Sequence, residues 1–289
     1  MTTVSAPVDT TAARRATRQR WGNPWLYLPL TGALFLMLVP FLWMLSGSLK
    51  PESDIRKVPP VLIPGRPTTA NYHELFGKLD FVGMFTNSVV VAVAVTAGNL
   101  LFCSMLGYAL AKLEFRGRTT VFAVVIGTLM VPGLVTFVPL YVLTTNLGLT
   151  NSLLGLILPF LATPFGVFLM RQFIGSLPDE LIDAARMDGC HEIAIFWRII
   201  LPMTKPALAT LGIISFLGSW NNFLWPLVAA QSEDQYTLPV GLALASSGQD
   251  FTRYGVLLAG AVVVLLPVMI VFLLFQRHFV AGIATTGLK

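Results

Sequence analysis

The sequence has 289 residues, of which 55% are hydrophobic and only 11% are charged, and its mean hydropathy is +0.75. Soluble domains carry about 25% charged residues, so this composition excludes an ordinary soluble protein. The net charge of +5 falls in clusters between long apolar runs, which argues against nucleic-acid binding and favours membrane topology. The length accommodates one bundle of spans of about 20 residues each and leaves no room for a separate catalytic domain.

The first 20 residues are polar, contain four arginines and one acid, and show no apolar periodicity. They are predicted to form a disordered cytoplasmic tail, with a transit peptide as the alternative. A cleaved secretory signal is disfavoured because the apolar run from Trp21 to Leu49 is too long. Cys103 and Cys190 have neither the spacing of metal ligands nor the density of a disulfide scaffold, so both are predicted to be free thiols.

Long runs without charged residues predict an all-α, polytopic membrane bundle of six transmembrane helices, since about 20 apolar residues cross a bilayer. The longest run, 119–170, must hold two spans, and the turn residues TTNLGLTNS at 144–152 divide it. The predicted spans are about 25–47, 83–110, 119–143, 152–173, 206–230 and 254–276.

The loops between these spans differ in charge. Thirteen of the 19 lysines and arginines lie in the N-terminal tail, the 112–118 loop, the 171–205 loop and the C-terminal end. The other six lie in the 50–80 and 233–253 loops, where seven acidic residues outnumber them. Because short loops rich in Lys and Arg stay inside, we expect a multi-pass protein of the cell membrane with both termini in the cytoplasm.

Prolines are frequent inside the spans, and each removes a backbone donor that lipid cannot replace. They indicate either ordinary helix kinks or helices that shape a solute path. No ionisable residue lies deep in a span, which counts against a secondary carrier driven by an ion gradient. A secondary carrier or channel remains the alternative from another class.

The segment 174–205, between the fourth and fifth predicted spans, is amphiphilic and is predicted to form a cytoplasmic helix-turn-helix elbow. Ser176 is placed to cap its first helix, whose first turn contains Asp179 and Glu180 and therefore suits the positive end of the helix dipole. Gly189 is placed to end this helix in a left-handed conformation.

A second short helix is predicted from about Cys190 to Ile200, where the pair Leu201-Pro202 would end it. In its simplest interpretation the elbow links two spans and rests on the headgroups as an interfacial helix. The first helix suggests more, because it combines small and acidic residues. The small residues, Ala184 and Ala185, permit close approach of a partner. The acidic residues, Asp183 and Asp188, offer ion pairs to its arginines.

The elbow has the order and spacing of a known motif, formed by Asp183-Ala184-Ala185, Gly189, Ile199 and Leu201-Pro202. Three residues precede the glycine, nine separate it from the isoleucine, and one more precedes the Leu-Pro pair. This series resembles the EAA motif of bacterial ABC importer permeases. Asp183 stands where the family usually has Glu, which keeps the charge but shortens its reach.

Further patterns resemble the smaller permease of carbohydrate-type ABC importers, the group that includes the maltose and glycerol-3-phosphate systems. In chain order they are SLKPESDI, NSVVVAVAVTAGNLL, GYALAKLEFRGR, VPLYVLTTNLGLTNSLLGLILP, SWNNFLWPL and QRHFVAG. The resemblance covers most of the chain and implies an ABC importer transmembrane domain over residues 21–289.

The resemblance implies uptake of a sugar or a related polyol or phosphate solute, with an ABC permease for a non-carbohydrate solute as the alternative. The implied partners are a second permease subunit, a dimer of ATP-binding subunits, an extracytoplasmic solute-binding protein and membrane lipid. The elbow would be the coupling helix, with the contact residues Asp183, Ala184, Ala185, Asp188, Gly189, Leu201 and Pro202. The sequence lacks a GxxxxGK[ST] loop, so ATP and Mg are expected on the partner ATPase, and no cofactor on this chain.

Four residues of the fifth predicted span are candidates for the substrate pathway, namely Trp220, Asn221, Asn222 and Trp225. Aromatic faces stack on the C–H surfaces of a sugar, and amides bond to its hydroxyls. Amide side chains are costly in lipid unless they bond across helices or face a wet cavity. The alternative is a structural Asn with a Trp that anchors the membrane interface.

Two other segments are candidate contacts. The proline-rich 50–80 loop is predicted to be extended and external, where it either touches a solute-binding protein or merely connects. By resemblance, the tail after Arg277 is expected to lie against the ATPase subunits. His73, His191 and His278 are widely separated, so no metal site and no catalytic residue are predicted.

Overall fold

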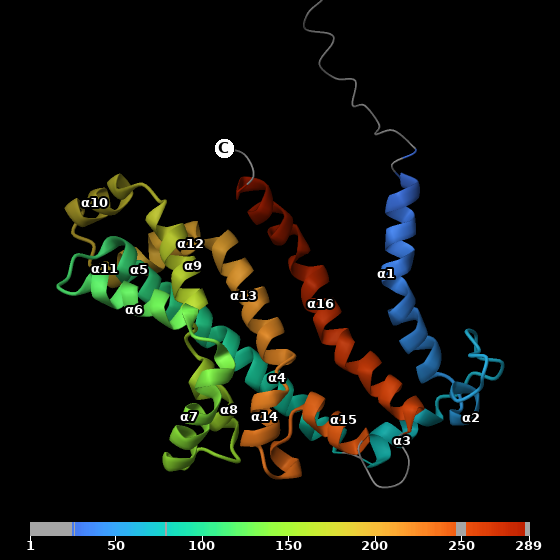
Figure 1. Ribbon diagram of the computed structural model, residues 1–289. Helices are drawn as coiled ribbons and strands as arrows, with labels where there is room; N and C mark the ends of the chain where they lie inside the picture. Colours follow the sequence, from blue (N-terminus) through green and yellow to red (C-terminus); the bar gives the residue numbers. More distant parts are fainter. Residues whose placement is uncertain (1–24, 26, 79, 247–252, 287–289) are drawn as a thin grey trace, which may run out of the picture.

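A computed structural model describes residues 25, 27–78, 80–246 and 253–286, and every regular element in these ranges is helical (Figure 1). The predicted tail, 1–20, lies outside the described residues. The α-helices are α1 (Tyr27–Ser48), α2 (Glu52–Ile55), α3 (Ala70–Lys78), α4 (Phe81–Gly98), α5 (Ser104–Lys112), α6 (Arg118–Met130), α7 (Gly133–Asn146), α8 (Leu153–Ile157), α9 (Pro164–Gly175), α10 (Asp179–Met187), α11 (Glu192–Ile195), α12 (Leu201–Met203), α13 (Lys205–Trp220), α14 (Leu224–Ala229), α15 (Leu238–Ser246) and α16 (Tyr254–Thr286). The π-helical segments are Asn99–Cys103 and Phe196–Ile200, and the 3-10 turns are Leu158–Phe160 and Glu233–Gln235.

Four helical stretches in these ranges are long and apolar enough to cross a membrane, and two bent helix pairs would raise the number to six. The four are Tyr27–Ser48, Phe81–Lys112, Leu153–Gly175 and Tyr254–Leu274. The bent pairs are α6 with α7, and Glu192–Met203 with α13. The predicted all-α, polytopic membrane fold is therefore confirmed.

The outside of the bundle is apolar. On α1, Leu28, Phe35 and Met37 are exposed, and on α16 Ile270 and Phe272 are exposed. Water would solvate such a continuous surface poorly, whereas lipid tails solvate it well. These faces are the ones that the membrane covers.

The elbow lies at the same end of the bundle as the first turn of α1 and the last turn of α16 (Figure 1). In this view that end is at the top, with α10 at the upper left. The helices α2, α3 and α15 and the turn between α7 and α8 lie at the bottom. The chain therefore passes from one end of the bundle to the other an even number of times, counted from the start of α1 to the end of α16.

The core joins α4 and α5 to α9 and α13. Residue 107 is glycine at the tightest contact between α5 and α9, because a Cβ there would lie 2.7 Å from the Met170 Cβ and 2.9 Å from the Arg171 backbone nitrogen. Buried apolar side chains of α5, α9, the elbow and α13 form one continuous cluster around this contact. The inner face of the elbow is thus part of the core.

The predicted span 119–143 is two helices, α6 and α7, whose axes differ by 106°. Val131 is extended (φ −82°, ψ 120°), as steric contact with a following proline ring favours. Pro132 then precedes the first residue of α7. Pro139, in contrast, lies inside α7 without ending it. The bend therefore depends on where the proline stands in the helix.

The predicted span 206–230 is also interrupted. Helix α13 ends at Trp220, and α14 begins at Leu224 after a short turn. At its other end α13 makes an angle of 81° with the stretch Glu192–Met203, so the last part of the elbow does not continue the span. The predicted turn at 144–152 lies between α7 and α8.

Candidate functional site: an elbow and a cavity between the helices

The first helix of the elbow (residues 174–205) is α10, and it ends at Gly189. This glycine has φ +79°, in the left-handed region that the sequence predicted. Its N–H donates to the Arg186 carbonyl, and the N–H of Cys190 donates to the Ala185 carbonyl, both at 3.0 Å. These two bonds form a Schellman motif, which fixes the direction in which the chain leaves α10.

The start of α10 differs from the prediction. Ser176 lies at the end of α9, where its hydroxyl donates to the Phe173 carbonyl at 2.7 Å, and Pro178 precedes α10 without a side-chain cap. The predicted Ser176 cap is wrong because Ser176 retains the helical conformation of α9. Asp179 and Glu180 occupy the first turn of α10 as predicted.

The two alanines of the motif differ in burial. Ala185 is only 6% exposed and packs into the core with Ile182, whereas Ala184 faces outward with Asp183. Met187 is 89% exposed on the outer side. The outer surface of α10 is therefore apolar and acidic, and Ala185 instead brings α10 close to its own chain.

Lys112, at the end of α5, joins the bundle to the start of α10. Its ammonium group donates to the Leu177 carbonyl at 2.6 Å and pairs with the Asp179 carboxylate at 2.5 Å. The hydrogen bond and the charge of Lys112 lower the pKa of the Asp179 carboxyl below its ordinary value. The side chain of Lys112 is almost fully buried, so this contact fixes it in one position.

A second connection links α5 to both elbow helices. The hydroxyl of Tyr108 donates to Glu192 Oε2 at 2.5 Å, and Arg186 Nε donates to Glu192 Oε1 at 2.8 Å. Arg186 also reaches Asp183 Oδ1 at 3.3 Å. Asp183 is thus linked through two side chains to the end of α5, while its carboxylate stays exposed for a partner.

The second elbow helix continues past its predicted end. The helical backbone runs from Glu192 to Met203 through the π-helical segment Phe196–Ile200. A proline ring crowds the carbonyl four residues earlier, and a π-turn widens the helix there. The prediction that Leu201-Pro202 ends the helix is therefore wrong. Leu201 packs partly into the core, and Pro202 is exposed.

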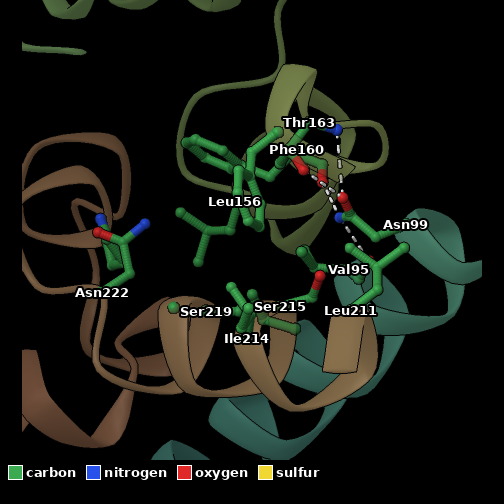
Figure 2. Close-up of a pocket in the computed structure, with 14 residues that line it drawn as sticks. Val95, Asn99, Leu156, Phe160, Thr163, Leu211, Ile214, Ser215, Ser219 and Asn222 are labelled. Atoms are coloured by element: carbon green, nitrogen blue, oxygen red, sulfur yellow. Dashed lines mark hydrogen bonds between the residues drawn. The ribbon is translucent and has the colours of Figure 1, made fainter. Parts of the chain in front are cut away.

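Inside the bundle, a cavity of about 430 Å³ lies between α4, the α8–α9 region and α13 (Figure 2). Figure 2 shows Asn99 at one end and Asn222 at the other, with α13 along one side. Leu156 and Phe160 form the opposite side. None of the 14 residues that line this cavity is charged.

At the cavity wall, the side-chain amide of Asn99 has hydrogen-bond partners for both its nitrogen and its oxygen. Its amide nitrogen donates to the Val95 carbonyl at 3.0 Å and the Phe160 carbonyl at 2.7 Å. Its amide oxygen accepts from the N–H of Thr163 at 3.1 Å and from the Thr163 hydroxyl at 2.7 Å. With 0% exposure and all these partners, Asn99 holds the start of α9 against α4 and has little capacity for a solute.

Ser215, Ser219 and Asn222 form the polar side of the cavity. Sequence reasoning missed the two serines, although the spacing i, i+4, i+7 indicates one face of a helix and so could have identified them. Asn222 Oδ1 accepts a long bond of 3.4 Å from the Trp225 N–H. The cavity thus combines hydroxyl and amide groups with apolar walls.

The other three predicted pathway residues do not line this cavity. Trp220 is 1% exposed and donates to the Val264 carbonyl at 3.1 Å, packed against rings of α4 and α13. Trp225 is equally buried and donates to the Gly155 carbonyl at 3.1 Å. Asn221 donates to the Leu217 carbonyl at 3.0 Å and is exposed on another side. The tryptophans join helices, and Asn222 alone of the four faces the cavity.

Within the described ranges, no group of three or more His, Cys, Asp or Glu side chains could hold a metal ion. The cavity offers hydrogen bonds and apolar contact, which are the interactions of a binding or translocation site.

Residues 103–285 match the family described as "Binding-protein-dependent transport system inner membrane component". The chain is 43% identical over 262 residues to the arabinooligosaccharides transport system permease protein AraQ of Bacillus subtilis (strain 168), covering 88% of this chain and 91% of that protein. It is 35% identical to the lactose transport system permease protein LacG of Rhizobium radiobacter (89% and 93% covered). It is 33% identical to the sn-glycerol-3-phosphate transport system permease protein UgpE of Yersinia pestis (87% and 92% covered).

The fold is similar to that of a chain from a crystal structure of a bacterial ABC transporter involved in the import of the acidic polysaccharide alginate. The TM-score is 0.80 at 24% identity, with 95% of this chain and 100% of that chain covered, so the likeness concerns the fold alone. Together with the family match and the EAA-like elbow, these relatives assign the chain. It belongs to the binding-protein-dependent transport system inner membrane components and is a permease subunit of the carbohydrate-uptake type of ABC importer.

Proposed function

We propose that this permease subunit passes an oligosaccharide through the cavity of Figure 2. The observation that carries the proposal is the lining of that cavity, which places Ser215, Ser219 and Asn222 opposite apolar side chains and contains no charge. A neutral sugar uses both kinds of surface, because its hydroxyls form hydrogen bonds and its C–H faces pack on apolar groups.

A phosphate-bearing solute fits this cavity less well. Phosphate groups are recognised by Arg and Lys through charge-assisted hydrogen bonds, and neither residue lines the cavity. The relatives named for arabinooligosaccharides and for lactose share more identity with this chain than the one named for sn-glycerol-3-phosphate. Both observations support the sugar half of the original expectation over the polyol or phosphate half.

The proposal includes coupling to a separate ATP-hydrolysing subunit through the elbow. The outer surface of α10 presents Asp183 and Ala184 beside the exposed Met187, which suits a cleft with an apolar floor and a basic rim. Asp188 and Gly189 lie at the end of this surface, and both are exposed. ATP and Mg would bind to that partner, and its closure would displace the elbow as a near-rigid body.

The remaining proposed partners follow from the two ends of the bundle. A second permease would complete the membrane domain, and a dimer of ATP-binding subunits would lie at the elbow end. An extracytoplasmic solute-binding protein would meet the opposite end, which includes α2 and α3. The first turn of α1 and the last turn of α16 lie at the elbow end, which supports the proposal that both termini are cytoplasmic, as the distribution of basic residues predicts.

The cavity is tested by filling it. A Cβ added at Gly218 meets no atom within 4 Å, and the position lines the cavity. In the complete importer reconstituted in vesicles, Gly218→Leu should assemble normally and reduce uptake of the transported sugar severely. Gly127→Leu is the matched control, since Gly127 on α6 also has free space around it but lies outside the cavity. Uptake at the normal rate by Gly218→Leu would exclude this cavity as the path.

The elbow is tested independently by charge. Asp183→Arg should weaken retention of the ATPase subunit and reduce both uptake and solute-stimulated ATP hydrolysis, while membrane insertion stays normal. A reversed charge on the basic partner residue of the ATPase should partly restore transport. Glu180→Arg serves as control for a general charge effect, because Glu180 is exposed one turn earlier on the same helix. Equal losses in both variants would remove Asp183 from its proposed role.

A further inference from the structure

A second cavity, of about 520 Å³, lies at the elbow end of the bundle, where α6 begins beside α9. Unlike the cavity of Figure 2, it contains charged side chains, namely Arg118, Arg171 and Glu114. Two guanidinium groups and one carboxylate leave the lining with a net charge of +1. Its volume is within the range of about 300–1,000 Å³ typical of small-ligand sites.

Arg171 has an unused donor at this cavity. Its guanidinium carbon lies 4.3 Å from the centre of the Phe122 ring, and its Nη1 donates to Gln172 Oε1 at 2.8 Å. Its Nε is buried and has no hydrogen-bond partner among the described residues. Leaving a buried charged donor without an acceptor is costly, so an acceptor supplied at this cavity would stabilise the Arg171 guanidinium group.

Arg118 adds the second positive charge. Its guanidinium group donates to the carbonyls of Leu110, Ala111 and Leu113 at the end of α5. These neutral acceptors fix the group in place and leave its charge unpaired. The cavity thus holds a guanidinium that cannot move away when a ligand arrives.

The first turn of α6 strengthens the attraction for an anion. No side chain caps this 13-residue helix, and its first turn contains no acidic residue. The hydroxyls of Thr119 and Thr120 belong to that turn, and both residues line the cavity. Phosphate oxygens accept hydrogen bonds from such hydroxyls, and the positive end of the helix dipole attracts their negative charge.

The surroundings are apolar. None of the residues of α6 is buried, and Val121, Val124 and Leu129 are exposed on it. A ligand in this cavity therefore meets cationic donors at one end of α6 and a lipid-facing surface along the rest. A free anion or a carboxylate of a partner protein would use only the first of these features.

We propose that this cavity binds the phosphate group of an anionic phospholipid, whose acyl chains lie along the outer face of α6. Basic pockets between transmembrane helices at the membrane boundary are suited to such headgroups. The site is independent of the sugar path, because the two cavities share no lining residue.

The proposal is tested on the full chain in detergent, titrated with phosphatidylglycerol and followed by native mass spectrometry. Arg171→Gln should weaken lipid binding by about fivefold, which corresponds to the roughly 1 kcal/mol that one basic residue contributes at an anionic surface. Arg116→Gln is the matched control, since Arg116 is exposed in the turn that precedes α6 and does not line the cavity. Equal weakening by both variants would mean a general charge effect and would overturn the site.

Two further measurements complete the test. The first separates lipid phosphate from free inorganic phosphate, and the second uses the unaltered chain, so it does not depend on the folding of a variant. Arg171-dependent binding of inorganic phosphate in the absence of lipid would assign the cavity to a soluble anion instead. A photoreactive phosphatidylglycerol, added to the unaltered chain, should label the segments around Arg118 and Arg171. Labelling confined to other segments, or labelling lost when the complete importer assembles, would exclude a resident lipid.

Discussion

Tyr108, near the end of α5, donates a hydrogen bond to Glu192, which lies 84 residues further along the chain, with 2.5 Å between the two oxygens. The other oxygen of the same carboxylate accepts from Arg186 on α10. One carboxylate therefore connects a membrane helix to both helices of the elbow. The position of the proposed coupling surface depends on this junction.

We expect Tyr108→Phe to loosen the elbow without changing its helices. The variant removes the donor to one oxygen of the half-buried Glu192 carboxylate, and a hydrogen bond to a charged group is worth about 1.5–3 kcal/mol. In the reconstituted importer the ratio of sugar transported to ATP hydrolysed should fall. Tyr141→Phe, which removes a hydroxyl at the opposite end of the bundle, should leave that ratio unchanged. An unchanged ratio in Tyr108→Phe as well would show that the junction is not needed for coupling.

Substitutions at Gly189 separate the effect of backbone strain from the effect of side-chain size. Because no atom of this chain lies within 4 Å of an added Cβ, substitutions there act on the fold of the elbow through φ +79° and not through a clash. Gly189→Val should cost about 1–3 kcal/mol locally and reduce ATPase retention and uptake together. Gly189→Asn should be much milder, since Asn tolerates the left-handed region. Similar transport by the valine and asparagine variants would contradict the argument from φ.

The Lys112–Asp179 pair predicts a pH effect with a defined sign. The pKa of Asp179 is lower in the folded chain than its ordinary value of 3.8, because Lys112 stabilises the carboxylate. This contribution to stability is complete above the ordinary pKa and is lost as the pH falls through 3.8 towards the lower value. The difference in Tm between the natural chain and Asp179→Asn should be constant near neutral pH and vanish in strong acid. In a Lys112→Met background the same substitution should show a smaller difference, because Arg186 and Arg118 still act on the Asp179 carboxylate.

In span five we expect different effects from neighbouring residues. Trp220→Ala removes a buried ring that joins three helices, and large-to-small changes of this kind cost about 3–5 kcal/mol, so the variant should be lost from the membrane. Ser219→Leu should remain in the complex and lose uptake, because Ser219 faces the cavity. Thr210→Leu, on the same helix outside the cavity, should transport normally. Intact complex with normal uptake in Ser219→Leu would remove α13 from the path.

Topology is tested by labelling single cysteines from outside intact cells, in a chain without Cys190. A cysteine at position 66 should react strongly, and one at position 191 should not, because the elbow is expected to be cytoplasmic. Permeabilised cells provide the control, in which both positions should react. Labelling of position 191 but not position 66 in intact cells would reverse the orientation.

The sequence predicted the helical class, the turn between α7 and α8, and the left-handed Gly189, since each depends on local chemistry. It indicated kinks at the prolines inside the spans, but it did not predict that the kink at Pro132 would divide a span into two helices. Both prolines lie in apolar sequence, but Pro132 stands at the break before α7, whereas Pro139 lies inside α7. Tertiary packing decides between these outcomes, and a single sequence does not contain that information in local form.

The candidate site shows the same division. The outward position of Asp183 follows from helix periodicity, whereas the burial of Ala185 depends on how closely α10 approaches α9, which no local pattern specifies. Trp220 and Trp225 were assigned to the pathway from their chemistry alone. Their indole N–H groups instead satisfy backbone carbonyls of other helices, and the spacing of two serines was the better signal.

Helix α9 begins at the joint made by Asn99 at the cavity wall and ends where the elbow starts. Its contact with α5 at Gly107 is so close that a Cβ at this position would meet the backbone of α9, so the two helices pack directly against each other there. In the proposed function, α9 would therefore transmit a movement of the elbow directly to the wall of the sugar path. A partner ATPase bound to the elbow would then be unable to complete its cycle without changing the width of the cavity, which would keep hydrolysis in the absence of sugar low.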